Sequence, residues 1–220
     1  MIIKKTFDYG LVKTKKLVNK LYEKKVRKQI KTDNFSIICS SCIGGIIYNR
    51  LGMKFLTPAI NLWLKQGEFI KMISNLEGYM NKELKFIDSE YDYPVARIGE
   101  GDDSVNIYFN HADSIEKARD DWNKRRTRIN YDNLYVILYD RMISKEDIIK
   151  LKDLPCKRLV VLSEKEYSDI SYVKTIKKSK KPRPNDFSFL DKDIFGIRTF
   201  EKQFDYVAWL NGEEKFWRSV

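Results

Sequence analysis

The stretch NFSIICSSCIGGIIYNRLGM, residues 34–53, gathers chemically useful side chains at one turn. An apolar run ends at Cys39, and the serine–glycine turn, residues 40–45, follows with Ser40, Ser41, Cys42, Gly44 and Gly45. If a helix begins near Ser41, its first backbone N–H groups and its dipole favour an anion. The turn matches neither the dinucleotide fingerprint nor the P-loop, so close helix-to-strand packing is an equal explanation for the glycines.

The spacing of Cys39 and Cys42 is that of a thioredoxin motif. Cys39, however, ends an apolar strand, where buried and inert thiols are common, and no cis-proline context of a redox fold is recognisable. We therefore do not expect redox chemistry. The chain has three cysteines, the third being Cys156, which are too few for a disulfide scaffold and indicate a reducing compartment.

Further polar residues follow other expected strands. His111 is the only histidine, Asp140 and Arg141 follow the apolar run LYVILY, and residues 163–164 follow RLVVL. In an open parallel sheet, ligands bind beyond the carboxyl ends of the strands, so one crevice would bring these residues to the serine–glycine turn. The alternative is that polar residues follow strands because loops are solvated. His111 is the natural general base, since its ordinary pKa lies near neutrality.

A helix expected over residues 113–129 ends in KRRTRIN, with Arg126 close to its apolar stripe. An arginine there can bind a carboxylate or a phosphate, or it can stabilise the carboxyl end of the helix. At the rise of an α-helix, His111 and Arg126 are separated by on the order of 20 Å. They cannot hold the same small reacting group, so a shared function requires a long ligand or two sites.

The order of the elements predicts an α/β fold of three layers, with a mixed, mostly parallel sheet and helices on both faces. Strands are expected near residues 37–39, 86–87, 93–99, 104–110, 134–139 and 158–162. Thr57 followed by Pro58 predicts the start of a long helix. We expect three parts: a basic amphipathic helix at 1–32, an α/β core at 33–173, and a basic, irregular extension at 174–220 that packs on the core and ends in a short helix near FDYVAWL.

The net charge of +11 is unevenly distributed. Residues 1–31 carry eleven Lys or Arg against two acids, which gives +9, and residues 174–183 carry six with no acid. Val18, Tyr22 and Val26 lie near one stripe of the first helix, which could rest on an anionic membrane or pack on the protein's own core. We do not expect nucleic acid as a partner, because no recognised nucleic-acid motif accompanies the lysines.

The 220 residues, 43% of them apolar, are enough for one substantial core. No apolar run approaches the roughly 20 residues of a spanning helix, and no signal-peptide pattern follows the basic start. We expect a cytoplasmic protein, attached peripherally to the inner face of the membrane if the first helix binds lipid. The sequence indicates no metal site and leaves the cofactor undefined.

Three blocks of the chain, FSIICSSCIGGIIYNRLGMKFLTPAINLWL, YPVARIG and IYFNHADSIEKARDDWNKRRTRINYDNLYVILYDR, resemble an uncharacterised bacterial domain family found among exopolysaccharide and capsule biosynthesis proteins. The resemblance covers roughly residues 34–210. It implies an α/β fold and a role near surface-polysaccharide assembly, and family members are sometimes labelled as transferases. It brings no catalytic residues with it. The chain departs from the family pattern at Ser40 and Ser41, in place of asparagines, and at Ile43, in place of an aromatic residue.

One leading function and two alternatives follow. The first is a transferase acting on a sugar nucleotide or a lipid-linked glycan, in which the serine–glycine turn and Arg141 hold a diphosphate, His111 is the general base, and Asp140 orients the base or a divalent metal. The second is an acyltransferase with Cys42 or Ser41 as nucleophile, activated by His111. The third is a non-catalytic glycan-binding or scaffold protein at the membrane face.

Overall fold

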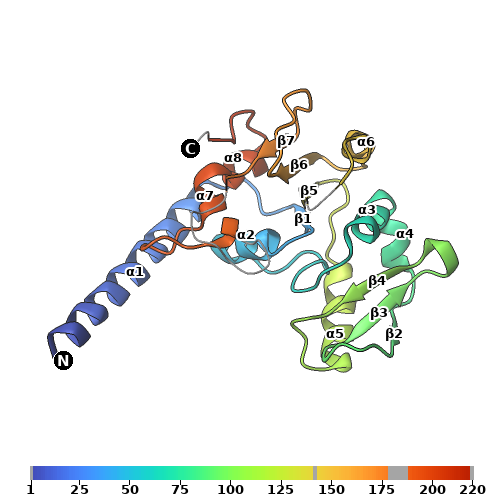
Figure 1. Cartoon of the computed structure of the whole chain (residues 1–220), viewed down its shortest axis with the longest axis horizontal. Coiled ribbons are helices and arrows are strands. Elements are labelled where there is room, and N and C mark those ends of the chain that lie inside the picture. Colours follow the sequence, from blue (N-terminus) through green and yellow to red (C-terminus); the bar gives the residue numbers. More distant parts are fainter. Residues whose placement is uncertain (1, 141–142, 178–187, 219–220) are drawn as a thin grey trace. The chain divides into compact units, whose positions relative to one another are not determined.

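The computed structural model describes residues 2–140, 143–177 and 188–218 (Figure 1). The chain forms two compact units. Unit 1 consists of Met1–Asp33, Ile47–Met53 and Thr175–Val220, and unit 2 consists of Asn34–Ile46 and Lys54–Lys174. Arg141, which we expected to contact a diphosphate, lies outside the described residues.

The α/β class predicted from the sequence is confirmed by a four-stranded sheet with the order β1-β5-β6-β7. The strands β1 and β5 pair in parallel, as do β5 and β6. Every residue of β5 is buried, as a central parallel strand requires. The bounds are β1 (Ser36–Cys39), β5 (Leu134–Tyr139), β6 (Arg158–Ser163) and β7 (Val173–Thr175).

The other three strands form a separate antiparallel sheet with the order β2-β3-β4. They are β2 (Lys85–Ile87), β3 (Val95–Ile98) and β4 (Val105–Tyr108). We had expected them to share one mostly parallel sheet with β1, β5 and β6. The segments 88–94 and 99–104 that join them are shorter than the dozen or more residues that a parallel crossover needs, so the chain closes hairpins instead.

Both sheets contribute to one hydrophobic core in unit 2, together with the helices of that unit. Ile38 and Val136 enter this core from the parallel sheet, Ile107 from the antiparallel sheet, and Phe69 and Trp122 from helices. The elements around it are α3 (Gln66–Ser74), α4 (Leu76–Asn81), η1 (Gly101–Asp103), α5 (Ile115–Arg126), α6 (Lys145–Lys150) and η2 (Leu151–Asp153).

Helix starts in unit 2 follow side-chain caps. Ser114 and Ser144 accept hydrogen bonds from backbone N–H groups in the first turns of α5 and α6. The long helix expected from Thr57 does not begin there, because the Thr57 hydroxyl accepts from the backbone N–H of Ala59 in a turn. Its helical part starts at Gln66 instead and is interrupted at Asn75, between α3 and α4.

The helix α2 (Ile43–Leu51) begins against the opposite face of β1. A Cβ atom on Gly44 would lie 2.8 Å from the Cβ of Cys39 and 3.7 Å from the side chain of Ile37. Residues Ile37 and Cys39 alternate with Ile38, which faces the core, so both faces of the parallel sheet are covered.

Unit 1 combines α1 (Ile2–Gln29) with a C-terminal segment that carries η4 (Ser188–Leu190), α7 (Thr199–Gln203) and α8 (Tyr206–Leu210). The short helix expected near FDYVAWL is confirmed as α8. Val26 of α1 is buried, and the Tyr22 hydroxyl lies 3.5 Å from that of Tyr206. The second half of α1 therefore packs on the protein itself. Across the described residues, no helix combines the length and apolar character that crossing a bilayer requires.

Candidate functional site

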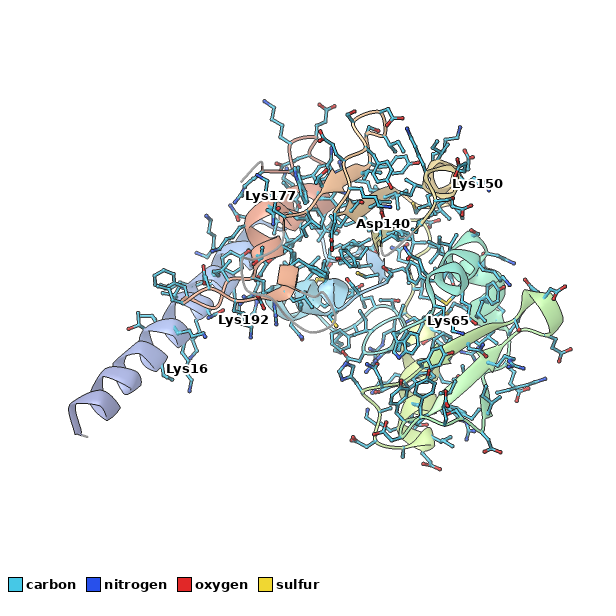
Figure 2. The ribbon with its side chains drawn as sticks, in the orientation of Figure 1. Lys16, Lys65, Asp140, Lys150, Lys177 and Lys192 are labelled. Carbon is cyan, nitrogen blue, oxygen red and sulfur yellow. The ribbon has the colours of Figure 1, made fainter. Side chains whose placement is uncertain are left out.

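The carboxyl ends of β1, β5 and β6 meet at one edge of the parallel sheet, where Figure 2 labels Asp140. The Ser40 hydroxyl accepts a hydrogen bond of 2.9 Å from the backbone N–H of Tyr139. Asp140 is buried, and its carboxylate accepts from the backbone N–H of Ile143 at 2.9 Å and from the Ser163 hydroxyl at 2.8 Å. Ser40 and Asp140 thus tie neighbouring strand ends together and hold this edge in a fixed shape.

The serine–glycine turn lies at the same edge and leads into α2. The Ser41 hydroxyl accepts from the backbone N–H of Ile43 at 3.4 Å, so Ser41 helps to cap a helix that begins two residues later. Gly44 is buried against Cys39, and a Cβ on Gly45 would lie 3.4 Å from Ile60. Close packing therefore explains why position 44 is a glycine. Ser41 and Gly45 are half-buried, so both keep part of their surface in contact with solvent.

The two cysteines of this turn differ in access. Cys42 is exposed, whereas Cys39 is buried. Burial raises the pKa of the Cys39 thiol, because the thiolate would lose its hydration. Cys42 is therefore the thiol of this turn that a reagent or a substrate can reach.

His111 is exposed in the turn between β4 and α5. We had placed it beside the serine–glycine turn on the assumption that β4 belongs to the parallel sheet. That assumption is wrong, because β4 is the edge strand of the antiparallel sheet. The sheet topology therefore gives no reason to place His111 in one crevice with the serine–glycine turn. The role of His111 stays a prediction.

Arg126 has structural partners at the end of α4. Its guanidinium donates hydrogen bonds to the carbonyl oxygen of Met80 at 2.7 Å and to that of Lys82 at 3.4 Å. The last carbonyl groups of a helix lack partners within the helix, and a cation satisfies them well. These contacts are structural, but they lie at the end of α4 and not at the end of α5, the helix that carries Arg126 and that we expected it to stabilise.

A second cluster lies on the outer face of the antiparallel sheet, opposite the core. We call the rings of Trp63, Tyr91, Tyr93 and Tyr108 the aromatic face. Trp63 stacks on Tyr108 with ring centroids 3.8 Å apart and an interplanar angle of 10°. Tyr91 stands edge-on to Tyr108 at 5.4 Å and stacks with Tyr93 at 5.1 Å. The main chain of Trp63 also extends the sheet through two hydrogen bonds of 3.0 Å with Tyr108.

Polar side chains adjoin the aromatic face. The Arg97 guanidinium donates to the side-chain oxygen of Asn106 at 3.1 Å. Asn106 donates to one carboxylate oxygen of Glu68 twice, from its side-chain amide at 2.9 Å and from its backbone N–H at 3.1 Å. The other carboxylate oxygen of Glu68 is buried and has no hydrogen-bond partner within the described part of the chain. Burial raises the pKa of the Tyr108 hydroxyl, and the nearby charge of Glu68 raises it further.

The aromatic face was missed in the sequence because its members are far apart in the chain. Trp63 and Tyr108 meet only through the pairing of their backbones at the sheet edge. There were two local signals: Tyr91-Asp92-Tyr93 just before β3, and Asn106 and Tyr108 of β4 at positions that alternate with core residues.

Comparison with known proteins places these features in a family. The model of the family described as "Domain of unknown function (DUF1919)" matches residues 13–211. An "Uncharacterized protein" of Haemophilus influenzae (strain ATCC 51907 / DSM 11121 / KW20 / Rd) is 28% identical over 204 residues, which represent 90% of this chain and 97% of that protein. The family match includes both the serine–glycine turn and the aromatic face.

Proposed function

The chain belongs to the DUF1919 family of domains of unknown function, and from this premise we propose that it is a glycan-acting transferase of surface polysaccharide biosynthesis. Its substrate would be a sugar nucleotide or a lipid-linked glycan. It would act in the cytoplasm, at the inner face of the membrane. The aromatic face of unit 2 is the observation that carries the proposal.

Sugar rings and the aromatic face have complementary chemistry. A pyranose presents C–H groups on its flat faces, which pack on aromatic rings, and hydroxyl groups on its rim, which need donors and acceptors. Tyr91 supplies ring surface, since 41% of the residue is exposed. Arg97 supplies a cationic donor, and Glu68, whose second carboxylate oxygen is buried and has no hydrogen-bond partner among the described residues, would supply an acceptor once its side chain turns towards the ligand. A buried acceptor without a donor is costly, so a sugar hydroxyl would stabilise this group.

The transfer step is assigned to the carboxyl edge of the parallel sheet. A diphosphate would lie at the start of α2, where the positive end of the helix dipole favours an anion, with Arg141 as its cation. The bonds of Ser40 and Asp140 support this assignment by making the edge rigid. The role of His111 comes from the sequence prediction alone, since β4 is not part of the parallel sheet: it would accept the proton of an acceptor hydroxyl as that oxygen attacks the sugar carbon and the phosphate leaves.

Two alternatives make different use of the same residues. An acyltransferase would use exposed Cys42, or Ser41, as the nucleophile with His111 as its base. A glycan-binding protein without catalysis would need only the aromatic face, which is why that face favours it as the second candidate. Transfer of a sugar from a sugar nucleotide separates the proposed transferase from both alternatives.

The first test concerns glycan binding by the aromatic face. We expect Tyr91→Ala to weaken the binding of oligosaccharide fragments of surface polysaccharides by about tenfold or more, because it removes the exposed ring of the stack. Isothermal titration calorimetry measures this loss. Tyr131→Ala is the matched control, since Tyr131 is 37% exposed in the same unit but lies outside the aromatic face, and it should change the affinity less than about twofold. Equal affinities for wild type and Tyr91→Ala would overturn the assignment of the site.

The second test separates transfer from binding alone. Wild-type protein is incubated with sugar nucleotides and an oligosaccharide that binds, and mass spectrometry detects the extended product. We expect His111→Ala to lower turnover by on the order of 100-fold. Because His111 is exposed, the free energy of unfolding of the His111→Ala variant should differ from that of wild type by less than about 0.5 kcal/mol. Binding without any product would favour the non-catalytic alternative, and acyl transfer lost on alkylation of Cys42 would favour the acyltransferase.

A further inference from the structure

Unit 1 presents an exposed apolar turn beside lysines of α1, and we infer that this surface docks on an anionic lipid bilayer. We call this surface the turn face. This inference goes beyond the proposed glycan chemistry and does not depend on it. The turn face consists of Val12, Lys15 and Lys16 of α1 and of Lys192, Ile194 and Phe195 of the C-terminal segment.

The turn has a fixed shape because its backbone groups are satisfied. The carboxylate of Asp193 accepts from the backbone N–H of Phe195 at 2.9 Å and from that of Ile197 at 3.0 Å. The backbone N–H of Gly196 donates to the carbonyl oxygen of Asp193 at 3.0 Å. Lys202 pairs with Asp193 at 2.8 Å. The turn therefore does not need its apolar side chains to hold it together.

The turn is also fastened to α1. The side-chain amide of Asn19 donates to the carbonyl oxygen of Phe195 at 2.6 Å, and Arg50 donates to that of Gly196 at 2.9 Å. Gly196 has a φ of +83°, and a Cβ there would lie 2.3 Å from the Asn19 amide, so glycine is required. Because Gly196 has no side chain, the backbone of the turn can lie directly against Asn19 of α1.

These contacts leave the apolar side chains in solvent. Ile194 is 75% exposed and Phe195 is 43% exposed. Val12 is also exposed, seven residues before Asn19 and hence on the same side of α1. Scattered apolar residues are common on surfaces, but a rigid turn that holds two neighbouring ones outward is suited to insertion among lipid chains.

The charge around the turn identifies the partner. Lys15 and Lys16 lie four and three residues before Asn19 and are exposed, and Lys192 precedes the turn. Figure 2 labels Lys16 and Lys192. Arg198 lowers the pKa of Lys192, and burial, Lys15 and Arg50 lower it further, so cations are crowded here. The nearby acids Glu201 and Asp193 already pair with Arg50 and Lys202.

Lipid phosphates would neutralise this excess of positive charge. Exposed lysines are attracted to anionic lipid, and the residues 1–31 alone carry a net charge of +9, from eleven cations and two acids. A nucleic acid would satisfy the lysines but would gain little from an isoleucine at the tip of the turn. The combination of lysines with Ile194 and Phe195 therefore favours a bilayer surface.

The lipid-facing residues differ from those that the apolar stripe of α1 suggested. Tyr22 and Val26 of that stripe face the C-terminal segment. Leu17 and Leu21 are each 58% exposed, but they lie two residues before and after Asn19, which is about 160° around the helix from it. They occupy the opposite side of α1 and provide a matched control of similar exposure and composition.

The test compares full-length variants by sedimentation with phosphatidylcholine vesicles that contain or lack phosphatidylglycerol. We expect wild type to bind only the anionic vesicles and to be released at about 1 M salt, where charge attraction is screened within about 3 Å. Ile194→Ser/Phe195→Ser should bind about tenfold or more weakly. Leu17→Ser/Leu21→Ser should change binding less than about twofold.

A conservative variant distinguishes the loss of an apolar side chain from misfolding of the turn. Ile194→Trp keeps an apolar tip, so it should bind like wild type and shift its fluorescence to the blue on anionic vesicles as the indole enters the lipid. The inference is overturned if wild type ignores anionic vesicles, if the serine variant of the turn binds as wild type does, or if the leucine variant shows the larger loss.

Discussion

Two polar clusters of this protein differ in how many of their hydrogen-bond donors and acceptors have partners. In unit 1, the buried guanidinium of Arg50 makes two hydrogen bonds to Glu201, at 2.8 and 3.0 Å. Its remaining N–H groups bond to Asn19 at 2.7 Å, Glu23 at 3.4 Å and the carbonyl oxygen of Gly196 at 2.9 Å. Every nitrogen of this arginine therefore has a partner inside the unit.

The cluster beside the aromatic face of unit 2 is incomplete by comparison. Glu68 receives two hydrogen bonds on one oxygen and none on the other within the described residues. Arg97, at the other end of the same chain of hydrogen bonds, is exposed. Buried polar groups are normally paired, so a saturated cluster stabilises the fold, whereas an unsaturated one near the exposed ring of Tyr91 retains capacity for a ligand.

Removing Arg50 should produce the largest effect on stability. Arg50→Met leaves the carboxylate of Glu201, whose side chain is fully buried, without its cation, and should lower the free energy of unfolding by about 3–5 kcal/mol. Urea unfolding followed by circular dichroism measures this loss. Glu23→Gln is the control, because Glu23 is 33% exposed and should cost less than about 1 kcal/mol. Equal losses in the two variants would refute the structural role of the saturated cluster.

A second saturated pair, in unit 2, gives a pH-dependent test. The Tyr79 hydroxyl donates to the backbone oxygen and to a carboxylate oxygen of Asp103, both at 2.9 Å. Burial, together with the hydrogen bond to Asp103 and its charge, raises the pKa of Tyr79 to about 12. Since the folded state holds the proton more tightly than the unfolded chain, with its ordinary pKa near 10, the contribution is complete below about pH 10 and is lost as the pH rises towards 12.

The expected loss across this range is about 1–2 kcal/mol, because solvent screens part of the interaction at Asp103, whose side chain is 61% exposed. Unfolding titrations at several pH values between about 9 and 12 measure it. Tyr79→Phe is less stable at neutral pH but should lack this part of the slope, while the titration of lysines and other tyrosines remains. An unchanged slope in Tyr79→Phe would show that the pair does not govern alkaline stability.

The sequence predicted those features of the fold that depend on neighbouring residues. The apolar run LYVILY identified the buried strand β5, and the Ser144–Asp147 spacing identified the start of α6. The assignment of β4 to a sheet failed because strand patterns alone do not say which strands pair. The short segments between β2, β3 and β4 would have indicated hairpins had their length been weighed.

The candidate site, like the fold, was predicted only where it depends on neighbouring residues in the sequence. Ser40 and Asp140 could be placed at a strand edge, because each follows an apolar run directly. The aromatic face could not be predicted, since the stack of Trp63 on Tyr108 depends on long-range pairing at the edge of the sheet. That one carboxylate oxygen of Glu68 lacks a hydrogen-bond partner among the described residues is equally a property of the folded chain.

Glu68→Gln should have the smallest effect on stability and a clear effect on binding. The variant keeps an oxygen that accepts from Asn106, and the oxygen that it replaces has no hydrogen-bond partner among the described residues, so the free energy of unfolding should change by less than about 1 kcal/mol. A hydrogen bond from a sugar hydroxyl to a carboxylate is roughly twice as strong as one to an amide, so oligosaccharide affinity should fall by about tenfold. Calorimetric titration measures the affinity, and Glu77→Gln, on α4 of the same unit, is the control for loss of one negative charge. A large loss of stability with unchanged affinity would place Glu68 with Arg50, as a group that serves the fold alone.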